Sequence, residues 1–327
     1  MHDPSIVVSQ PIDRYRAMQS ADLQMRTADP PSESRSKMRD WNFLQELNKS
    51  AAALPIGPAV PGKSIEKIIH QTYYSRTLPP EIVENIELIK KLNPGWEHRL
   101  YFDEDILKFI QGNYGPDMLR VYQKLSPRYG AAKADFFRYL LIYKVGGVYL
   151  DIKSTIDCAF DDVLKPDDQF ILSYWNNKAG EKHATWGLHH DYPELTEGEF
   201  QQWHVIAARG HPFLKAVIEN VYANINRYIP AVHATGKDGV LRVTGPIAYT
   251  LAIKPLLPLH PHRMIDSERD LGLEYSIYSG VTHKGVFKSH YATQKTSIVK
   301  IGLGKSLFSG LWATWQVFEK VWRRLFH

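Results

Sequence analysis

Residues 128–157, RYGAAKADFFRYLLIYKVGGVYLDIKSTID, decide the fold of this chain. The segment Ala131–Val145 has few polar interruptions, which predicts a buried helix. Gly146 and Gly147 end that helix, as glycine commonly does at a helix C-terminus. Val148–Ile152 then predicts a strand that ends in an acid. Because ligands bind at the carboxyl ends of strands in open α/β sheets, we expect a site at this strand end.

The sequence on either side alternates between β-like and helical segments. The expected elements are strands at Ile65–His70, Trp96–Phe102 and Gln169–Trp175, and helices at Pro80–Leu92, Pro212–Tyr228 and Gly245–Ile253. Residues 255–299 are rich in His, Pro and Gly, which predicts irregular structure. The strand–helix–strand alternation favours an α/β domain with a largely parallel sheet.

The composition is that of a soluble globular protein and excludes several classes. Of 327 residues, 44% are hydrophobic and 23% are charged, with 40 Lys and Arg against 35 Asp and Glu. The single cysteine excludes an intramolecular disulfide and a metal site built from cysteines. The chain has no P-loop, G-x-S-x-G, H-E-x-x-H or G-x-G-x-x-G motif, and the last absence argues against a nucleotide-dependent oxidoreductase.

We expect three parts: an N-terminal arm or linker with a short helix at 1–62, a folded domain at 63–299 and a basic amphipathic helix at 300–327. Met1–Thr27 lacks the apolar run of a secretory signal, and no window reaches the roughly 18 apolar residues of a transmembrane helix. The expected location is therefore the cytoplasm, or the inner face of the cell membrane for a peripheral protein.

The last segment carries most of the net charge of +5, because residues 300–327 hold five bases and one acid, a net of +4. Its apolar side chains step by three and four: Phe308, Leu311, Trp315, Phe318, Trp322 and Leu325. A basic, aromatic stripe is typical of a helix that lies on an anionic membrane surface. The alternative is a helix docked on the domain or on a second subunit. The charge gives no argument for nucleic-acid binding.

Asp135 and Arg138 are three residues apart on the expected helix and therefore share a face. Burying unpaired charge is costly, so both need partners. One interpretation is an internal ion pair, and the other is a polar pair that faces a ligand beside Asp151. In an extended chain Asp151 and Lys153 point to the same side. The acid could hold a divalent metal that bridges a diphosphate, and the lysine could neutralise phosphate directly. A solvated strand end is the alternative.

Three further places carry polar groups. His70, Gln71 and Thr72 end the first expected strand and could hydrogen-bond a base or a sugar, or be ordinary loop residues. The turn at Gly245 could present backbone N–H groups to an anion, or simply begin a helix. His290 could be a metal ligand, although a chain with fourteen histidines places one there readily by chance.

Together these segments resemble the sugar-transferase domain with a DXD motif of glycosyltransferase family 32, over about residues 63–295. The similar segments are Lys67–Thr72, Ala134–Tyr139, Gly146–Asp151, Trp203–His204, Gly210–Phe213 and Thr244–Pro246. The resemblance implies a GT-A type, Rossmann-like mixed sheet flanked by helices, with extra helices at both termini here. It also implies transfer of a sugar, with retention, from a UDP- or GDP-sugar to a glycan, polysaccharide or lipid-linked acceptor, as in capsule or lipopolysaccharide synthesis.

Carried over by position, Asp135 and Arg138 would bind the donor sugar and diphosphate, and Asp151 would be the first acid of the motif. His70, Gln71 and Thr72 would lie near the nucleotide, with Tyr149 and Gly245 also assigned to the donor site. His290 matches a late metal-site histidine. Acceptor recognition is expected in the later segments, roughly 176–200 and 229–240.

One position departs from the family, because Lys153 stands where the motif has its second acid. One carboxylate fewer weakens binding of Mn²⁺ or Mg²⁺. Either Asp151 holds a metal with His290 and water, which we favour, or Lys153 and Arg138 offset the leaving diphosphate charge themselves. A different class stays open: a non-catalytic, membrane-associated protein that binds nucleotide-sugars or glycans.

Overall fold

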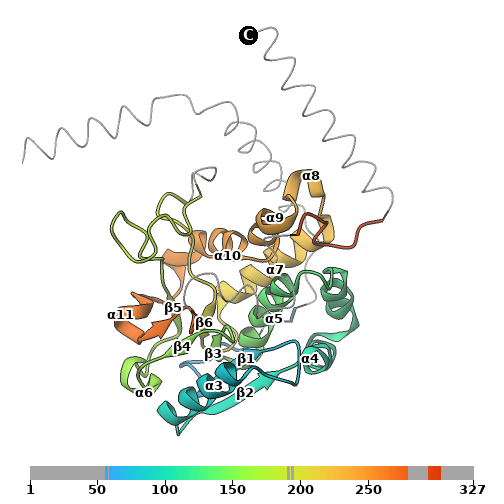
Figure 1. Ribbon diagram of the computed structural model, residues 1–327. Helices are drawn as coiled ribbons and strands as arrows, with labels where there is room; N and C mark the ends of the chain where they lie inside the picture. The colour runs from blue at the N-terminus through green and yellow to red at the C-terminus, as the bar shows by residue number, and fades with distance from the viewer. Residues whose placement is uncertain (1–55, 58, 190–191, 193–194, 279–293, 303–327) are drawn as a thin grey trace, which may run out of the picture. The chain divides into compact units, whose positions relative to one another are not determined.

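The computed structural model describes residues 56–57, 59–189, 192, 195–278 and 294–302, all within the unit Glu46–His327 (Figure 1). The expected N-terminal helix, His290 and the C-terminal apolar stripe lie outside the described residues. Across the residues that are described, no helix combines the length and the apolar composition needed to cross a membrane.

A six-stranded mixed sheet forms the centre of the fold, in the order β2-β1-β3-β6-β5-β7. Its strands are β1 (Ile68–Thr72), β2 (Glu97–Tyr101), β3 (Gly147–Leu150), β5 (Phe170–Leu172), β6 (His204–Ala207) and β7 (Arg263–Met264). Strand β1 is parallel to β2 and β3, whereas β6 is antiparallel to β3 and β5. Strand β7 is parallel to β5. Five of the six strands of this sheet therefore run in the same direction, and β6 runs in the opposite one. The expected α/β fold with a mixed, largely parallel sheet is confirmed.

Helices cover both faces of the sheet. They are α3 (Pro80–Leu92), α4 (Asp103–Lys124), α5 (Gly130–Val145), α6 (Phe160–Val163), α7 (Pro212–Arg227), α8 (Pro230–His233), α9 (Gly236–Val243), α10 (Pro246–Ile253), the 3-10 helix η2 (Lys254–Leu259) and α11 (Ser267–Leu271). Side chains of α4, α5, α7, α9 and α10 form one core with Tyr149 of β3. Those of α3, α6 and α11 form another with Val148 and Leu150. The two-residue alternation of β3 therefore turns Tyr149 towards α5.

The late part of the chain is more regular than expected. Residues 255–278 hold most of η2, then β7, α11 and β8 (Leu273–Glu274), and β8 pairs antiparallel with β4 (Thr155–Ile156). These elements are short, with two residues in each of β7 and β8. Elements of that length leave no periodic pattern in a sequence, which is why residues 255–299 gave an expectation of irregular structure.

The turn from α5 into β3 requires glycine. Gly146 and Gly147 have φ values of +78° and +99°, which L-residues with a side chain rarely adopt. A Cβ on Gly147 would also lie 2.5 Å from the carbonyl oxygen of Ile68 on the neighbouring strand. The turn thus lets β3 pair tightly with β1, where Val148 lies opposite Ile69. Asp151 owes its position to this turn, because it directly follows β3.

We predict that Gly147→Ala lowers the free energy of unfolding by about 2–4 kcal/mol, from the positive φ and the collision with Ile68. Gly112→Ala is the control, because Gly112 lies within α4 and a Cβ there meets nothing within 4 Å. That change should be neutral or slightly stabilising. Urea unfolding compares the two variants, and equal effects would contradict the role given to the turn.

Candidate active site

Arg138 lies within α5, among buried apolar neighbours. Its Nη2 forms ion pairs with Asp135 Oδ1 at 3.2 Å and with Asp151 Oδ1 at 2.9 Å, so one nitrogen joins the helix to the end of β3. Its Nη1 donates to the carbonyl oxygen of Gln202 over 2.5 Å. The guanidinium carbon also lies 4.6 Å from the centroid of the Tyr149 ring, a cation–π distance. These contacts fix the guanidinium against α5, β3 and the residues before β6.

Asp135 is held from several directions and is 3% exposed. Its Oδ1 accepts from Gln202 Nε2 over 3.1 Å and also forms the ion pair with Arg138, and its Oδ2 accepts from the Thr244 hydroxyl over 3.0 Å. Burial raises the pKa of the Asp135 carboxyl, and the charge of Arg138 opposes that shift. The internal ion pair expected from the sequence is therefore present. Because a carboxylate has about four lone-pair sites, Oδ2 can accept one further hydrogen bond.

Asp151 is the more open of the two acids. Its side chain is 25% exposed, against 4% for Asp135 and 3% for Arg138. Its Oδ1 forms the ion pair with Arg138, and within the described part of the chain its Oδ2 has no hydrogen-bond partner. A ligand at the end of β3 would therefore meet Asp151 first, with Arg138 directly behind it.

Lys153 does not share a strand face with Asp151, which corrects the geometry expected from an extended chain. Strand β3 ends at Leu150, and Ser154 N–H donates to the Asp151 carbonyl over 2.8 Å, closing a turn. Lys153 is 8% exposed, and its Nζ lies 3.3 Å from the centroid of the Tyr275 ring. Burial lowers the pKa of Lys153 to about 8, although Asp151 opposes the shift. Among the described residues its ammonium has neither a hydrogen-bond acceptor nor an ion-pair partner.

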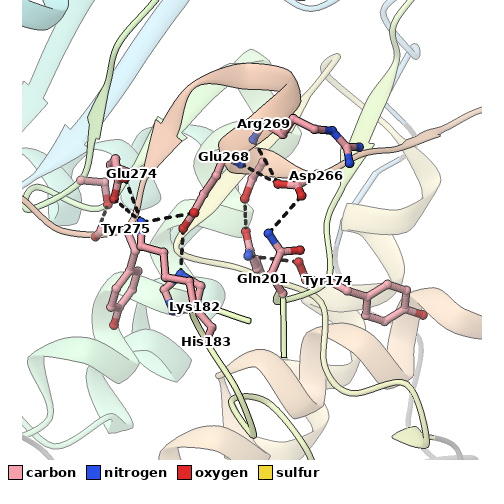
Figure 2. Close-up of polar contacts among 12 residues, drawn as sticks. Tyr174, Lys182, His183, Gln201, Asp266, Glu268, Arg269, Glu274 and Tyr275 are labelled. Atoms are coloured by element: carbon pink, nitrogen blue, oxygen red, sulfur yellow. Dashed lines mark hydrogen bonds and ion pairs between the residues drawn. The ribbon is translucent and has the colours of Figure 1, made fainter. Parts of the chain in front are cut away.

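Tyr275 is held in place by a polar network between the loop after β5 and the α11–β8 segment, which Figure 2 shows. Lys182 Nζ lies 3.2 Å from Glu268 and 2.8 Å from Glu274, and His183 Nε2 lies 2.7 Å from Glu268. The Tyr275 ring then packs edge-on against the rings of Trp175, Trp186 and Trp203, with centroids 5.3, 5.7 and 5.7 Å away. The aromatic surface under Lys153 is therefore built by segments distant from β3 in the sequence.

Of the three residues that end β1, only Thr72 reaches this cluster. Its hydroxyl lies 2.9 Å from the hydroxyl of Tyr149, whose ring lies under Arg138. His70 is fully buried, with Nδ1 3.1 Å from the Tyr101 hydroxyl and Nε2 3.1 Å from the Gly146 carbonyl. Burial lowers the pKa of His70 to about 3, so the ring is neutral at pH 7. Both ring nitrogens are used inside the protein, which leaves neither for a nucleotide.

Gln71 points to the opposite face of β1, as strand alternation requires. It is fully buried, and its Oε1 lies 2.9 Å from His98 Nε2 on β2. His70 and Gln71, expected near the nucleotide, thus have their side chains engaged inside the protein and on opposite faces of β1.

The turn at Gly245 begins helix α10, which is one of the two interpretations of this segment. The N–H groups of Thr244 and Gly245 both donate to the Val240 carbonyl, over 3.1 and 2.8 Å, and Pro246 has no N–H. None of these three residues has a backbone N–H left for an anion. The Thr244 hydroxyl contacts Asp135 instead. Gly245 is required for packing, since a Cβ would lie 2.9 Å from the Val240 carbonyl oxygen.

Two residues of the cluster were missed from the sequence. Gln202 contacts Arg138 through its carbonyl and Asp135 through its amide, and Tyr139 donates to Gln202 Oε1 over 3.1 Å and to the Thr244 carbonyl over 2.9 Å. The position of Gln202 directly before the Trp203-His204 segment is a weak signal, and Tyr139 lies inside the central motif. Burial raises the pKa of Tyr139 well above its usual range, so its hydroxyl remains a donor.

The described residues do not fit a divalent-metal site. None of them form a group of three His, Cys, Asp or Glu side chains able to hold a metal. Asp151 Oδ1 is already bound to Arg138, and the neighbouring side chain that the motif would supply as a carboxylate is an ammonium. The expected second ligand, His290, lies outside the described residues.

Comparison with known proteins identifies the region that contains this cluster. Residues 79–173 match the family described as "Glycosyltransferase sugar-binding region containing DXD motif". The resemblance of this region to glycosyltransferase family 32 is therefore confirmed.

Similar proteins include fungal mannosyltransferases. The chain is 31% identical over 158 residues to "Inositol phosphoceramide mannosyltransferase 3" of Schizosaccharomyces pombe, which is 48% of this chain and 37% of that protein. It is 28% identical over 176 residues to "Initiation-specific alpha-1,6-mannosyltransferase" of Candida albicans, which is 49% of this chain and 43% of that protein. The chain thus spans less than half the length of both relatives.

A solved structure described as "PaToxG Glycosyltransferase" is also similar, with a TM-score of 0.44 and 16% sequence identity. The similarity covers 70% of this chain and 81% of that one.

We predict that Arg138→Met lowers the free energy of unfolding by about 3–5 kcal/mol, because two carboxylates lose their buried partner. Adding Asp135→Asn should recover part of the loss, since it removes one unpaired charge. Arg99→Met is the control: Arg99 forms an exposed pair with Glu97, which is worth less than about 1 kcal/mol. Urea unfolding measures all three, and equal losses for Arg138 and Arg99 would contradict this account.

Proposed function

We propose that the protein is a retaining glycosyltransferase that moves a sugar from a UDP- or GDP-sugar to an acceptor hydroxyl. The observation that carries the proposal is the Asp135–Arg138–Asp151 cluster at the end of β3, inside the region that matches the family. The bond from the sugar C1 to the phosphate oxygen breaks, and its electron pair leaves with the diphosphate. The acceptor oxygen forms the new bond to C1 from the same face. Its proton passes to the departing phosphate oxygen.

The described side chains support separate roles in this reaction. The free lone pair of Asp135 Oδ2 suits a hydroxyl of the donor sugar. Hydrogen bonds from Thr244 and Gln202 already fix the orientation of this carboxylate. Arg138 keeps Asp151 oriented at the strand end. Fixed positive charge beside the leaving diphosphate stabilises the charge that develops there. A divalent metal held by Asp151 and His290 would supply the same charge, but the described residues alone do not form its site.

The relatives guide the finer proposal. Their names describe mannosyltransferases, one of which acts on inositol phosphoceramide, so we propose a hexose donor, with mannose foremost, and a glycan or lipid-linked acceptor. A role in building a capsule or a lipopolysaccharide at the inner face of the cell membrane belongs to the same proposal. It would engage residues 300–327 as the membrane contact. The alternative function, a non-catalytic nucleotide-sugar-binding protein, is favoured by the replacement of the second motif acid by Lys153.

A donor panel decides between these two functions. Purified protein is incubated with UDP- and GDP-sugars and a set of glycan and glycolipid acceptors, and nucleotide release and product are measured. Asp135→Asn should lower kcat by roughly 10²–10³-fold with the fold retained, because it removes a contact to the donor sugar. Asp161→Asn is the matched control, since Asp161 pairs with Lys67 at the surface. Nucleotide-sugar binding without turnover on any acceptor would support the binding protein.

The acceptor is proposed to lie against Trp186, within the segment 176–200. This indole is 45% exposed, and the rings of Trp175 and Tyr275 pack against it with centroids 5.2 and 5.7 Å away. A sugar ring has an apolar C–H face that suits a fixed aromatic surface. The same Tyr275 ring lies under Lys153, so one aromatic ring contacts both Trp186 and the lysine that follows β3.

We therefore predict that Trp186→Ala raises the KM for the acceptor about tenfold and leaves the KM for the donor unchanged. Leu259→Ala is the control, because Leu259 is also exposed and apolar but belongs to η2. Initial rates at varied acceptor and donor concentrations separate the two constants. A change confined to the donor KM would show that Trp186 belongs to the donor side.

A further inference from the structure

Lys153 is a buried positive charge that lacks a counterion in the described structure. The side chain is 8% exposed, and its ammonium is in contact with the face of the Tyr275 ring. A buried charge without an ion pair or hydrogen bond destabilises the folded state. A cation–π contact offsets only part of that cost. An anion from outside the chain would supply what is missing.

The charges around the end of β3 make that anion more specific. Asp135 and Asp151 contribute two negative charges, and Arg138 and Lys153 contribute two positive charges, so the cluster sums to zero. With an acid at position 153, as the DXD pattern has, the same four positions would hold three acids and one base, a sum of −2. One divalent cation would balance that sum. Lys153 therefore brings to the cluster the positive charge that a divalent cation would otherwise bring.

The available oxygens lead to the same conclusion. Mg²⁺ takes six oxygen ligands, and at phosphate sites one or two of them are protein carboxylates while substrate phosphates and water supply the rest. Among the described residues, Asp151 Oδ2 is the carboxylate oxygen left open at the strand end. An ammonium held close by would repel a cation there.

Lys153 is also held firmly enough to act as a fixed charge. Its carbonyl accepts from Ile277 N–H over 2.8 Å, and the Ser154 hydroxyl donates to the Tyr275 carbonyl over 3.1 Å. These two hydrogen bonds connect the turn after β3 to the segment that carries the Tyr275 ring. The Lys182, His183, Glu268 and Glu274 contacts in Figure 2 hold that chain in turn.

We propose that Lys153 binds the diphosphate of the nucleotide-sugar directly, as a fixed cation, and that donor binding requires no divalent metal. The proposal rests on the proposed function and names how its leaving group is held. An ammonium offers three donors to phosphate oxygens. As the C1–O bond breaks, the electron pair moves onto a diphosphate oxygen close to Lys153, which keeps its proton and stabilises the new charge.

Binding of UDP and GDP, measured by calorimetry in EDTA and then in Mn²⁺, tests the proposal without requiring turnover. The wild type should bind one of the two nucleotides with the same Kd in both conditions. Lys153→Met should weaken binding by about 10–100-fold in both, the loss of one charge-assisted contact. Lys153→Asp should bind weakly in EDTA and regain affinity in Mn²⁺. Lys165→Met is the matched control, because Lys165 is exposed, and its affinity should equal that of the wild type.

Folding is checked on the same samples. Because Lys153→Met removes an unpaired buried charge, its thermal unfolding midpoint should be no lower than that of the wild type. Binding by the wild type in Mn²⁺ only, unchanged affinity in Lys153→Met, or no binding of either nucleotide would each overturn the proposal. A wild type that transfers sugar only in Mn²⁺ would overturn the metal-free proposal and leave the proposed function standing. Metal-free nucleotide binding without transfer from any donor would overturn the proposed function and leave the role of Lys153 in binding standing.

Discussion

The double contact of Arg138 Nη2 with Asp135 and Asp151 is the interaction on which the rest of the site depends. It links a buried helix to the end of a buried strand, and it neutralises charge that neither element could hold alone. The surrounding groups hold the guanidinium in place. The Tyr149 ring lies under it, and the Gln202 carbonyl accepts a hydrogen bond from Arg138 Nη1. The two acids differ in their exposure to solvent, since the Asp135 side chain is almost fully buried and that of Asp151 is partly exposed.

The sequence was sufficient for the elements that build this interaction. The apolar run of α5, the Gly-Gly turn and the acid after β3 are local patterns, and the structure confirms the helix, the turn and the strand. The Asp135–Arg138 pair follows from helical spacing alone. Strand alternation could also have separated His70 from Gln71, because that rule needs only the strand itself.

The remaining contacts come from residues that are distant in the chain. Gln202 and Thr244 reach Asp135 from 67 and 109 residues away, and Tyr275 reaches Lys153 from a short segment without periodicity. Such pairings depend on how β6, α10 and β8 return to the sheet, which no local pattern encodes. The antiparallel course of β6 has the same origin. A turn at Asp151–Ser154, rather than an extended chain, then set the direction of Lys153.

The Gly146–Gly147 turn has one more consequence, for how such a chain can change over time. Because only Gly146 separates α5 from β3, Asp135, Arg138 and Asp151 lie in one short continuous stretch. An insertion or deletion between them would displace Asp151 from Arg138. The number of residues in this stretch must therefore stay constant for the ion pairs to form. The loop that carries Trp186 and the segment that carries Tyr275 lie outside it, and length changes there leave the ion pairs intact. The proposed acceptor surface can therefore change in length while the charged centre is kept.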